Sequence, residues 1–587
     1  MQCSDCTPPT SSLPHQALPS PELTLRTPSA AEDHTQRSSD SPRGHECRPE
    51  DATKTEESHQ LEEGDTAVSD PAKSPRTIIS FPRGDPENPY NWSTGRKMFI
   101  LFQGIVAVVN STLGSSLPSG AVDHLAEYFH VKSQAQLVLP ISLFLVGYVL
   151  GPVVFAPLSE SYGRRWVMVI TFVFFTIFTM ACAVAPTWSA FLVFRLLSGI
   201  TASSAIAVVG GLYADIYGNP ITRGRAMAFF MAATACGPVL APSISGFISV
   251  LTWRWTFWAG FIIAGASLAF LCFMPETYGP TILKRKAQRM RRQTGNPNIF
   301  APIELEKKGA RQMITITLTR PVRMFLFEAI VLFSCLYLSI AYAIFYLYFE
   351  AYPLVFQGVY GFNAGTAGLP FLAIGLGAFL ATGIFMYWDS VLIRAKKSNA
   401  RWPQIEEYRR LPLACIGGPL YVISLFWLGW SANANVHWIV PTLSGIPFGM
   451  GFMLIFMALL NYIADAYEIF AASAMAATSA CRSIFGAVLP IAGRPMYQGL
   501  GIPWASSLLG FLSLGMCIIP FAFIKYGDRI RANSTFCQEL REKKQLLARE
   551  EKEREGSDAS AQEEESGSAQ DEEIGGRPPL GQGDEKM

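Results

Sequence analysis

The chain has 587 residues, of which half are hydrophobic and only 16% are Asp, Glu, Lys or Arg. An ordinary soluble protein has about 25% of these charged residues. Residues 1–97 and 526–587 carry 26 charged residues each, so that the 428 residues between them carry only 41. A water-soluble domain of that size would need more charge on its surface, and lipid is predicted to surround this middle part. The composition excludes a cytosolic enzyme, a disulfide-rich secreted scaffold and a nucleic-acid binder.

The two ends of the chain read as polar tails. Residues 1–97 are predicted to be a disordered N-terminal tail, because the first 75 residues are rich in Ser, Pro, Thr, Glu and Asp and contain few large apolar residues. No signal peptide is recognised there. Residues 526–587 are predicted to be a charged C-terminal tail. Within that tail, the strong helix formers from Gln538 to Arg554 predict a solvated helix.

Twelve stretches are long and apolar enough to cross a membrane, which takes about 20 residues in a helix. They form two groups of six, so that residues 98–274 and 323–525 are predicted to be two six-helix bundles joined by a basic linker, 275–322. The fold class is therefore an all-α integral membrane protein. The predicted spans are 98–120, 137–157, 167–186, 188–209, 225–249, 254–274, 323–347, 366–389, 411–431, 437–460, 471–493 and 504–525.

The positions of the basic residues predict the orientation of these spans. If the N-terminus is in the cytoplasm, the five inner connections and their flanks carry twenty Lys and Arg residues, far more than the outer loops. This excess is typical of cytoplasmic loops. Because the number of spans is even, both termini are predicted to be cytoplasmic.

Two motifs lie in the first bundle. The loop after the second predicted span contains Glu160, Gly163, Arg164 and Arg165. Glycine permits a tight turn between two antiparallel helices, and the carboxylate and guanidinium groups can form charge networks at helix ends. Alternatively, the two arginines only set the topology.

The fifth span contains Gly237-Pro238, where glycine permits close packing and proline kinks the helix. The alternative is a packing helix without meaning for transport direction.

Arg195 lies about two turns into the fourth predicted span, four residues before Gly199. A charge at that depth normally faces the bundle interior or water. The guanidinium does not deprotonate. It can instead lower the pKa of a neighbouring acid or bind a carboxylate or phenolate. The alternative is that Arg195 is a structural hub for hydrogen bonds.

This arrangement resembles the major facilitator superfamily. The loop motif is similar to its Gly-x-x-x-Asp-x-x-Gly-Arg-Lys/Arg signature, with Ala156 and Glu160 in place of Gly and Asp. Arg195 and Gly199 match its Arg-x-x-x-Gly motif, which is associated with proton transfer. Gly237-Pro238 matches the Gly-Pro-rich motif of its antiporters, although Ala241 replaces a glycine. The resemblance implies that the substrate site lies near the middle of the membrane.

The stretches 85–93, 215–226, 480–486 and 504–510 look like the fungal twelve-span drug:proton antiporters of this superfamily. Residues 337–362 are similar to cercosporin-exporter-like members. The resemblance implies a set of residues that take part in conformational change: Glu160, Gly163, Arg164, Arg165, Asp215, Arg225, Gly237 and Pro238.

Candidate residues for coupling and cargo binding follow from polar groups inside the spans. Arg195, Glu328 and Arg482 are candidates for coupling, and Glu328 is the first choice for the proton carrier because an intramembrane carboxylate is costly unless it is functional or paired. The alternatives are a Glu328–Arg323 pair at the cytoplasmic interface and a structural role for Arg482. Asn110, Tyr342 and Tyr346 are candidates for the substrate cavity.

Several aromatic residues admit a second interpretation. Tyr342 and Tyr346 lie four apart, on one helix face, and aromatic rings with a polar tip suit a planar amphipathic cargo. A belt at the lipid interface is the alternative for Tyr348 and Phe349. Trp253 and Trp255 also read as such a belt.

We therefore expect proton-coupled efflux of small amphipathic organic molecules, such as fungicides or a self-made toxin, across the plasma membrane. An uptake or polyamine carrier of the same fold is the alternative, and a non-transporting sensor is a third hypothesis. The expected partners are the small-molecule substrate, protons and the lipid bilayer. A monomer is expected, without a metal ion, cofactor or nucleic acid, and not an enzyme.

Overall fold

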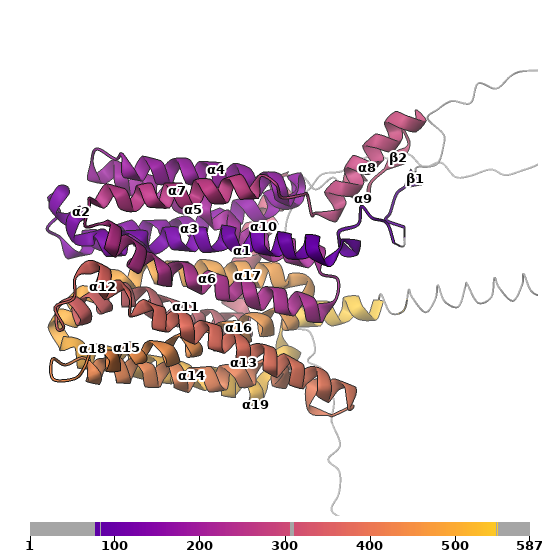
Figure 1. Cartoon of the computed structure of the whole chain (residues 1–587). Helices are drawn as coiled ribbons and strands as arrows, with labels where there is room; N and C mark the ends of the chain where they lie inside the picture. Colours follow the sequence, from indigo (N-terminus) through magenta and orange to yellow (C-terminus); the bar gives the residue numbers. More distant parts are fainter. Residues whose placement is uncertain (1–76, 83, 306–309, 547–548, 550–587) are drawn as a thin grey trace, which may run out of the picture. The chain divides into compact units, whose positions relative to one another are not determined.

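The structure is a computed structural model that describes residues 77–82, 84–305, 310–546 and 549. Its first long helices run side by side (Figure 1). After α1, the chain passes through a 3-10 turn, Leu117–Ala121, and the short helix α2, Val122–Tyr128. The long helices of this half are α1 Thr94–Ser116, α3 Gln134–Tyr162, α4 Arg164–Ala183, α5 Trp188–Ile216, α6 Pro220–Ile248 and α7 Trp253–Leu271.

The second half also consists of long helices, with short ones between them. The long helices are α11 Ala329–Tyr352, α13 Phe371–Lys397, α14 Glu406–Ser431, α16 Gly445–Tyr467, α17 Ala471–Val488, α18 Gly493–Met516 and α19 Ile518–Asn533. The short helices are α12 Ala364–Gly368 and α15 Ile439–Leu443, with a π-helical turn at Pro353–Gln357 and 3-10 turns at Trp402–Gln404, Glu468–Phe470 and Leu489–Ala492.

In the described residues, eleven helical runs have the length and hydropathy of a membrane span, against twelve predicted. The difference arises because the last run, Ala471–Asn533, is 63 residues long. Gly501 has a non-helical backbone with φ 75° inside α18, in the interval between the predicted spans 471–493 and 504–525. The all-α membrane fold is confirmed.

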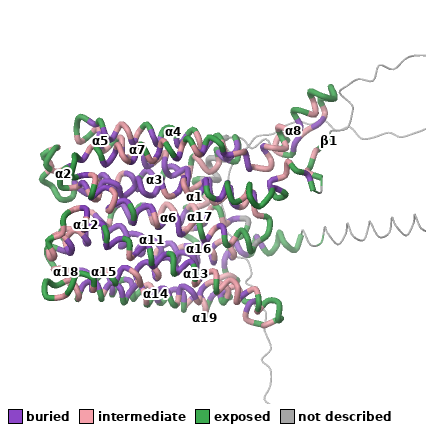
Figure 2. Tube along the Cα trace, in the orientation of Figure 1, coloured by how far each residue is buried: buried purple, intermediate pink, exposed green. Residues whose placement is uncertain are grey.

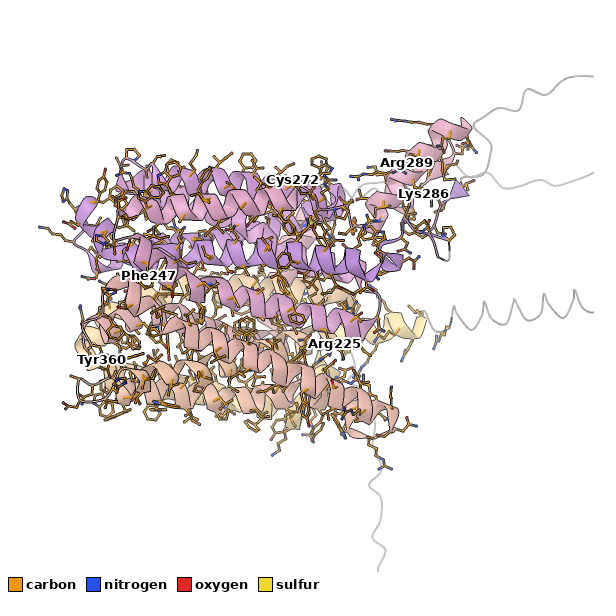
Figure 3. All side chains as sticks on the ribbon, in the orientation of Figure 1. Arg225, Phe247, Cys272, Lys286, Arg289 and Tyr360 are labelled. Carbon is orange, nitrogen blue, oxygen red and sulfur yellow. The ribbon has the colours of Figure 1, made fainter. Side chains whose placement is uncertain are left out.

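The long helices have two opposite ends, which labelled residues distinguish. Arg225, Lys286 and Arg289 lie toward the end where α8 is found, which we call the α8 end (Figure 3). Phe247 and Tyr360 lie toward the opposite end, where α2 is found, which we call the α2 end. These three basic residues, which belong to connections predicted to be cytoplasmic or flank them, thus lie at the α8 end.

The basic linker folds into α8 Gly279–Thr294, β2 Ile299–Phe300, α9 Pro302–Leu305 and α10 Ala310–Phe327. Strand β1, Thr77–Ile78, pairs in parallel with β2. The prediction of a disordered tail up to residue 97 is therefore wrong for its last part, which also contains a 3-10 turn at Pro89–Asn91. Lys286 Nζ lies 2.5 Å from Asp85, and its hydrogen bond lowers the pKa of that carboxyl.

The C-terminal tail begins as a packed helix. Residues 535–546 are helical, but Phe536, Cys537 and Leu540 are buried. The Phe536 ring lies 5.2 Å from the ring of Phe470. The predicted solvated helix thus packs against the protein at its start, and the end of the predicted stretch lies outside the described residues.

Helix α11 is buried along nearly its whole length (Figure 2). Tyr348 and Phe349 are 0% and 3% exposed, and their rings stack on Phe448 and Phe371 at 4.0 and 5.1 Å. The interpretation of these residues as a lipid belt is wrong, because other helices cover α11. Trp253 is buried as well, whereas Trp255 is exposed.

The two halves meet through α3 with α17 and through α6 with α12 and α13. The approach is close toward the α2 end, where a Cβ on Gly246 would lie 2.3 Å from Ala364 O and a Cβ on Gly368 2.7 Å from the Pro242 backbone. Among the described residues, four hydrogen bonds cross between the halves, and all four lie in the part of the helices nearer this end. They are Ser115–Tyr346, Ser142–Ala487 O, Ser243–Gly368 O and Arg494–Gln134.

Candidate functional site

A chain of hydroxyl groups joins the last turn of α1 in the first half to α11 in the second half. Ser115 donates to Thr112 O at 2.6 Å, so Tyr346 must donate to Ser115 Oγ, at 2.9 Å. Tyr342 in turn donates to the Tyr346 hydroxyl at 3.5 Å. The two predicted cavity tyrosines therefore lie together and are buried, and one of them contacts the other half.

Arg482 of α17 lies beside these tyrosines. Its guanidinium carbon is 5.5 Å from the ring centre of Tyr342 and 5.9 Å from that of Phe456. Its Nε is buried and has no hydrogen-bond partner among the described residues. A buried donor without a hydrogen-bond partner lowers the stability of the protein. A ligand that accepts a hydrogen bond from this donor would recover that loss. Arg482 is therefore suited to bind a polar group of a cargo.

Asn110 points elsewhere. Its side-chain amide donates to Ser267 of α7 at 2.9 Å, so its described contact lies within the first half. The neighbouring Ser111 donates to Ala202 O and accepts from Tyr148 at 2.6 Å. Ser111 and Tyr148, which sequence reasoning did not single out, join α1, α3 and α5.

Arg195 is 2% exposed, and its three nitrogens donate to three backbone carbonyls. These are Pro140 O on α3 at 2.9 Å, and Gly114 O and Ser115 O on α1 at 2.9 and 3.0 Å. The guanidinium also lies 4.6 Å from the ring centre of Phe144. These contacts fit the structural hub, and Ser115 O ties the hub to the hydroxyl chain.

The loop motif forms a charge network at the α8 end. Gly163 has φ 98°, which favours glycine, and it links α3 directly to α4. Arg164 is buried, and it contacts Asp215 at 3.0 Å and Ser159 at 2.7 Å. The network thus fixes the ends of three helices, α3, α4 and α5, relative to one another.

Glu276, which follows α7, completes this network and was missed by sequence reasoning. Its Oε1 accepts hydrogen bonds from the backbone N–H groups of Arg164, Thr277 and Tyr278, at 2.8, 3.1 and 3.1 Å. A Cβ on Gly163 would lie 2.3 Å from its Oε2. The sequence feature that could have pointed to Glu276 is an acidic residue just after the sixth predicted span, at the start of the basic linker.

The other predicted motif residues have different surroundings. Glu160 and Arg225 are exposed, and neither has a hydrogen bond or ion pair among the described residues. Arg165 donates to Cys272 O at 3.0 Å. Of the motif residues with charged side chains, the structure therefore joins Arg164 and Asp215.

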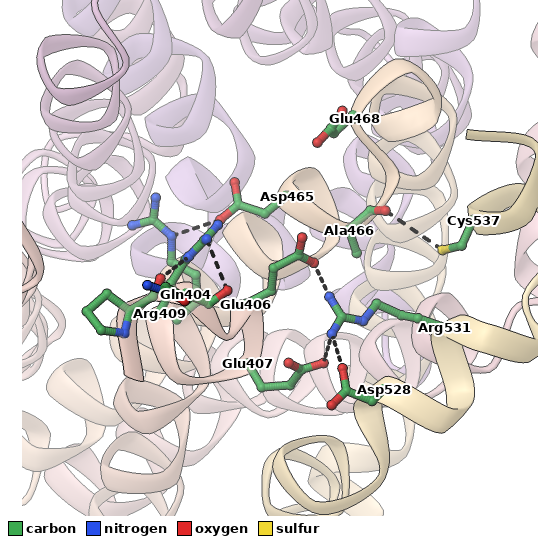
Figure 4. A network of polar contacts seen from close by, with 12 residues as sticks. Gln404, Glu406, Glu407, Arg409, Asp465, Ala466, Glu468, Asp528, Arg531 and Cys537 are labelled. Carbon is green, nitrogen blue, oxygen red and sulfur yellow. Dashed lines mark hydrogen bonds and ion pairs between the residues drawn. The ribbon is translucent and has the colours of Figure 1, made fainter. Parts of the chain in front are cut away.

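The second half has a comparable network at the α8 end (Figure 4). Arg410, near the start of α14, contacts Asp465 near the end of α16 at 3.2 Å, just as Arg164 of α4 contacts Asp215 of α5. The neighbouring Arg531 pairs with Glu407 and Asp528 at 2.6 and 2.7 Å, and with Glu406. Both halves thus carry an Arg–Asp pair between the corresponding helices.

Glu328 lies between α10 and α11, not inside a membrane helix. It is 2% exposed and has an extended backbone. Its carboxylate accepts from Tyr467 at 2.9 Å and from Thr535 at 3.3 Å. No ion pair joins it to Arg323 among the described residues. The expectation that Glu328 lies in the first turns of the seventh span is wrong, because the helix breaks at this residue.

This fold and these sites can be compared with those of known proteins. The model of the Major Facilitator Superfamily matches residues 104–490, more than half of the chain. The chain belongs to the major facilitator superfamily. This facilitator is 39% identical over 445 residues to the efflux pump FUB11 of Gibberella moniliformis, covering 75% of this chain and 74% of that protein. It is 35% identical over 488 residues to polyamine transporter 3 of Saccharomyces cerevisiae, covering 82% and 78%.

Among solved structures, the facilitator resembles the proton:xylose symporter XylE bound to 6-bromo-6-deoxy-D-glucose. The TM-score is 0.52 at 17% sequence identity, and the match covers 74% of this chain and 97% of XylE. This likeness supports the facilitator fold. The family makes the protein a membrane transporter of small molecules, and the resemblance to fungal efflux members is confirmed.

The Gly-Pro motif of this facilitator packs α6 on α1. A Cβ on Gly237 would lie 2.0 Å from Thr112 Oγ1, 2.5 Å from Leu113 N and 2.6 Å from Val109 O. The next residue, Pro238, lies inside α6, and its carbonyl accepts from Ser116 at 3.3 Å. The motif therefore brings two helices to the contact distance that only glycine permits.

Replacing Gly237 with alanine is expected to destabilise the facilitator by about 1–3 kcal/mol, because the added methyl group forces the helices apart. Adding Thr112→Ala should not restore stability, since the clash with the backbone of α1 remains. Thermal unfolding in detergent measures the effect. Gly265→Ala is the matched control, because its Cβ meets nothing within 4 Å. Equal melting of the two glycine variants would contradict this packing.

Proposed function

We propose that the protein exports small amphipathic organic molecules, bearing an aromatic part and a polar acceptor, across the plasma membrane in exchange for protons. The α8 end, with its basic residues, is then cytoplasmic, and so are both termini. The single observation that carries the choice of cargo is Arg482, whose buried Nε lies without a partner beside Tyr342.

The cluster around Arg482 supports a neutral or acidic cargo over a polyamine. The two buried tyrosines offer aromatic faces, and the guanidinium offers hydrogen bonds to an oxygen acceptor. Among the described hydrogen-bond, ring-pair and cation–π partners of Tyr342, Tyr346 and Arg482, none is Asp or Glu. A polycation in such a cluster would meet a positive charge without a carboxylate to bind it.

The names of the relatives leave both kinds of cargo open, since one is called an efflux pump and another a polyamine transporter.

The deciding experiment uses the purified protein in liposomes with an imposed pH gradient. The protein is offered an azole, a planar aromatic acid, spermidine and a sugar. Movement of the aromatic compounds against the proton gradient, abolished by collapsing the gradient, is the expected result. Movement of spermidine or sugar alone, or transport indifferent to the gradient, would overturn the proposal.

Replacing Arg482 with glutamine is expected to raise the KM for the aromatic acid about tenfold, the cost of one lost hydrogen bond to a charged group. The KM for the neutral azole should change much less, because the aromatic faces remain. Arg254→Gln is a control, since Arg254 contacts Tyr128 at the α2 end. An equal change of KM for both compounds would show that Arg482 is structural.

A further inference from the structure

A charge pair lies at the α2 end where the two halves meet. Glu350, near the end of α11, is 3% exposed, and its Oε2 lies 2.7 Å from Nε of Arg494 in α18. The other arm of the same guanidinium, NH1, donates to Oε1 of Gln134, 2.5 Å away in the first residue of α3. One arginine therefore joins a carboxylate of its own half to the opposite half.

Water can reach this pair from the α2 end. A cavity of about 330 Å³ is lined by both Glu350 and Arg494, together with Ser119, Asp123, Gln357 and Ala364. Asp123 is exposed, so the cavity extends to the surface. Asp123 and Arg494 are the charged groups that line the cavity with Glu350. Burial makes an unpaired charge costly, so the ion pair is stable only while Glu350 is ionised.

The pair also lies on the face of α11 that carries the candidate cargo cluster. Tyr342, Tyr346 and Glu350 follow one another at intervals of four residues, so they form one stripe along the helix. Tyr346 contacts Ser115 of the other half. The carboxylate of the charge pair and the candidate cargo cluster therefore lie on the same helix, α11.

We propose that Glu350 is the carboxylate that accepts the coupling proton from the α2 end, and that Arg494 is the positioning residue that converts this protonation into opening of that end. The inference rests on the proposed proton-driven export. A proton from the outer solution binds one carboxylate oxygen of Glu350, which becomes neutral. Arg494 then loses its counter-charge, turns toward the aqueous cavity and Asp123, and releases Gln134.

The first test compares two modes of transport by the full-length protein in liposomes. Glu350→Gln retains an oxygen that accepts from Arg494 but cannot ionise. Proton-driven accumulation of the planar aromatic acid of the panel above, used as the probe, should fall about tenfold or more. Exchange of labelled for unlabelled probe at equal pH on both sides should continue within about twofold, because exchange needs no net proton movement.

Glu127→Gln is the matched control, because Glu127 is an exposed acid at the same end. Accumulation by the Glu350→Gln protein equal to that of the control would overturn the inference, and so would equal loss of exchange and accumulation. If the unmodified protein shows no gradient-driven movement of this probe or of the panel above, the proposed function itself fails. The two failures are therefore distinguishable.

The second test follows the opening of the α2 end. A Ser119→Cys protein is treated with a membrane-impermeant maleimide, and the parent protein without this substitution gives the background. Labelling should become faster as the outer pH falls. With Glu350→Gln added, it should be fast and independent of pH, whereas with Asp123→Asn added it should keep its pH dependence. If the labelling rate of the Ser119→Cys protein itself does not depend on the outer pH, the inference is overturned.

Gln134→Ala provides a test that does not disturb the buried pair. Gln134 is exposed, and its removal leaves Glu350 and Arg494 bound to each other while breaking their bridge to α3. Labelling at position 119 should then be faster at neutral pH, and proton-driven accumulation should fall while thermal stability is retained. Unchanged labelling in this variant would show that the bridge does not hold the α2 end closed.

Discussion

Replacing Arg195 with lysine is expected to lower both thermal stability and transport. Three nitrogens of Arg195 donate to carbonyls on two helices, and an ammonium group on a flexible stem cannot reproduce that geometry. The loss of two such bonds costs about 1.5–3 kcal/mol each. We therefore expect a melting temperature lower by several degrees and little transport of any cargo, measured on the purified protein in detergent and in liposomes.

The alternative, a role confined to proton coupling, predicts a different pattern. The lysine variant would then melt like the unmodified protein and would still exchange labelled for unlabelled cargo at equal pH. Arg254→Lys is the matched control, because Arg254 forms its hydrogen bond at an exposed position. Normal melting of the Arg195→Lys protein would contradict the structural hub.

Replacing Glu276 with alanine is expected to have the second large effect. Three backbone N–H groups, including that of Arg164 at the start of α4, would lose their acceptor. Each buried donor left without a partner costs about 1–3 kcal/mol. We expect a marked fall in melting temperature and in transport rate. Glu276→Gln, which keeps an acceptor oxygen, should be less affected than the alanine variant.

Glu160 provides the informative comparison. It is the acid that matches the loop signature, but it is exposed and makes no ion pair or hydrogen bond among the described residues. Glu160→Ala should therefore be milder than Glu276→Ala in both measurements. If Glu160→Ala lowers the melting temperature or the transport rate more than Glu276→Ala does, the prediction is contradicted. Glu160 would then be the more important carboxylate at the α8 end for at least one step of transport.

Much of the fold could be predicted from the sequence because lipid imposes strict local rules. A membrane span needs a long apolar stretch with its backbone bonded internally, so hydropathy located the helices of both halves. The motif glycines could be found for a similar reason: the φ of Gly163 and the close contact at Gly237 are local demands that few other residues meet. The length of α10 and the pairing of β1 with β2 were not predictable in this way.

The roles of the individual polar residues depended on contacts between distant parts of the chain. Glu328 lies in an apolar stretch that reads as one span, yet its backbone is extended between α10 and α11, and its carboxylate binds Tyr467 and Thr535. Tyr348 and Phe349 look like interfacial residues until the helices that cover α11 are known. Hydropathy does not distinguish a helix face covered by lipid from one covered by protein.

The sequence by itself determined that this chain is a two-part helical membrane protein with its basic loops on one side, since hydropathy and charge act residue by residue. The tertiary structure decided which polar groups meet. Glu276 is 112 residues from Arg164, and Glu350 reaches the first half only through Arg494 and Gln134. Such contacts arise from the packing of whole helices, which sets distances that spacing along the chain does not contain.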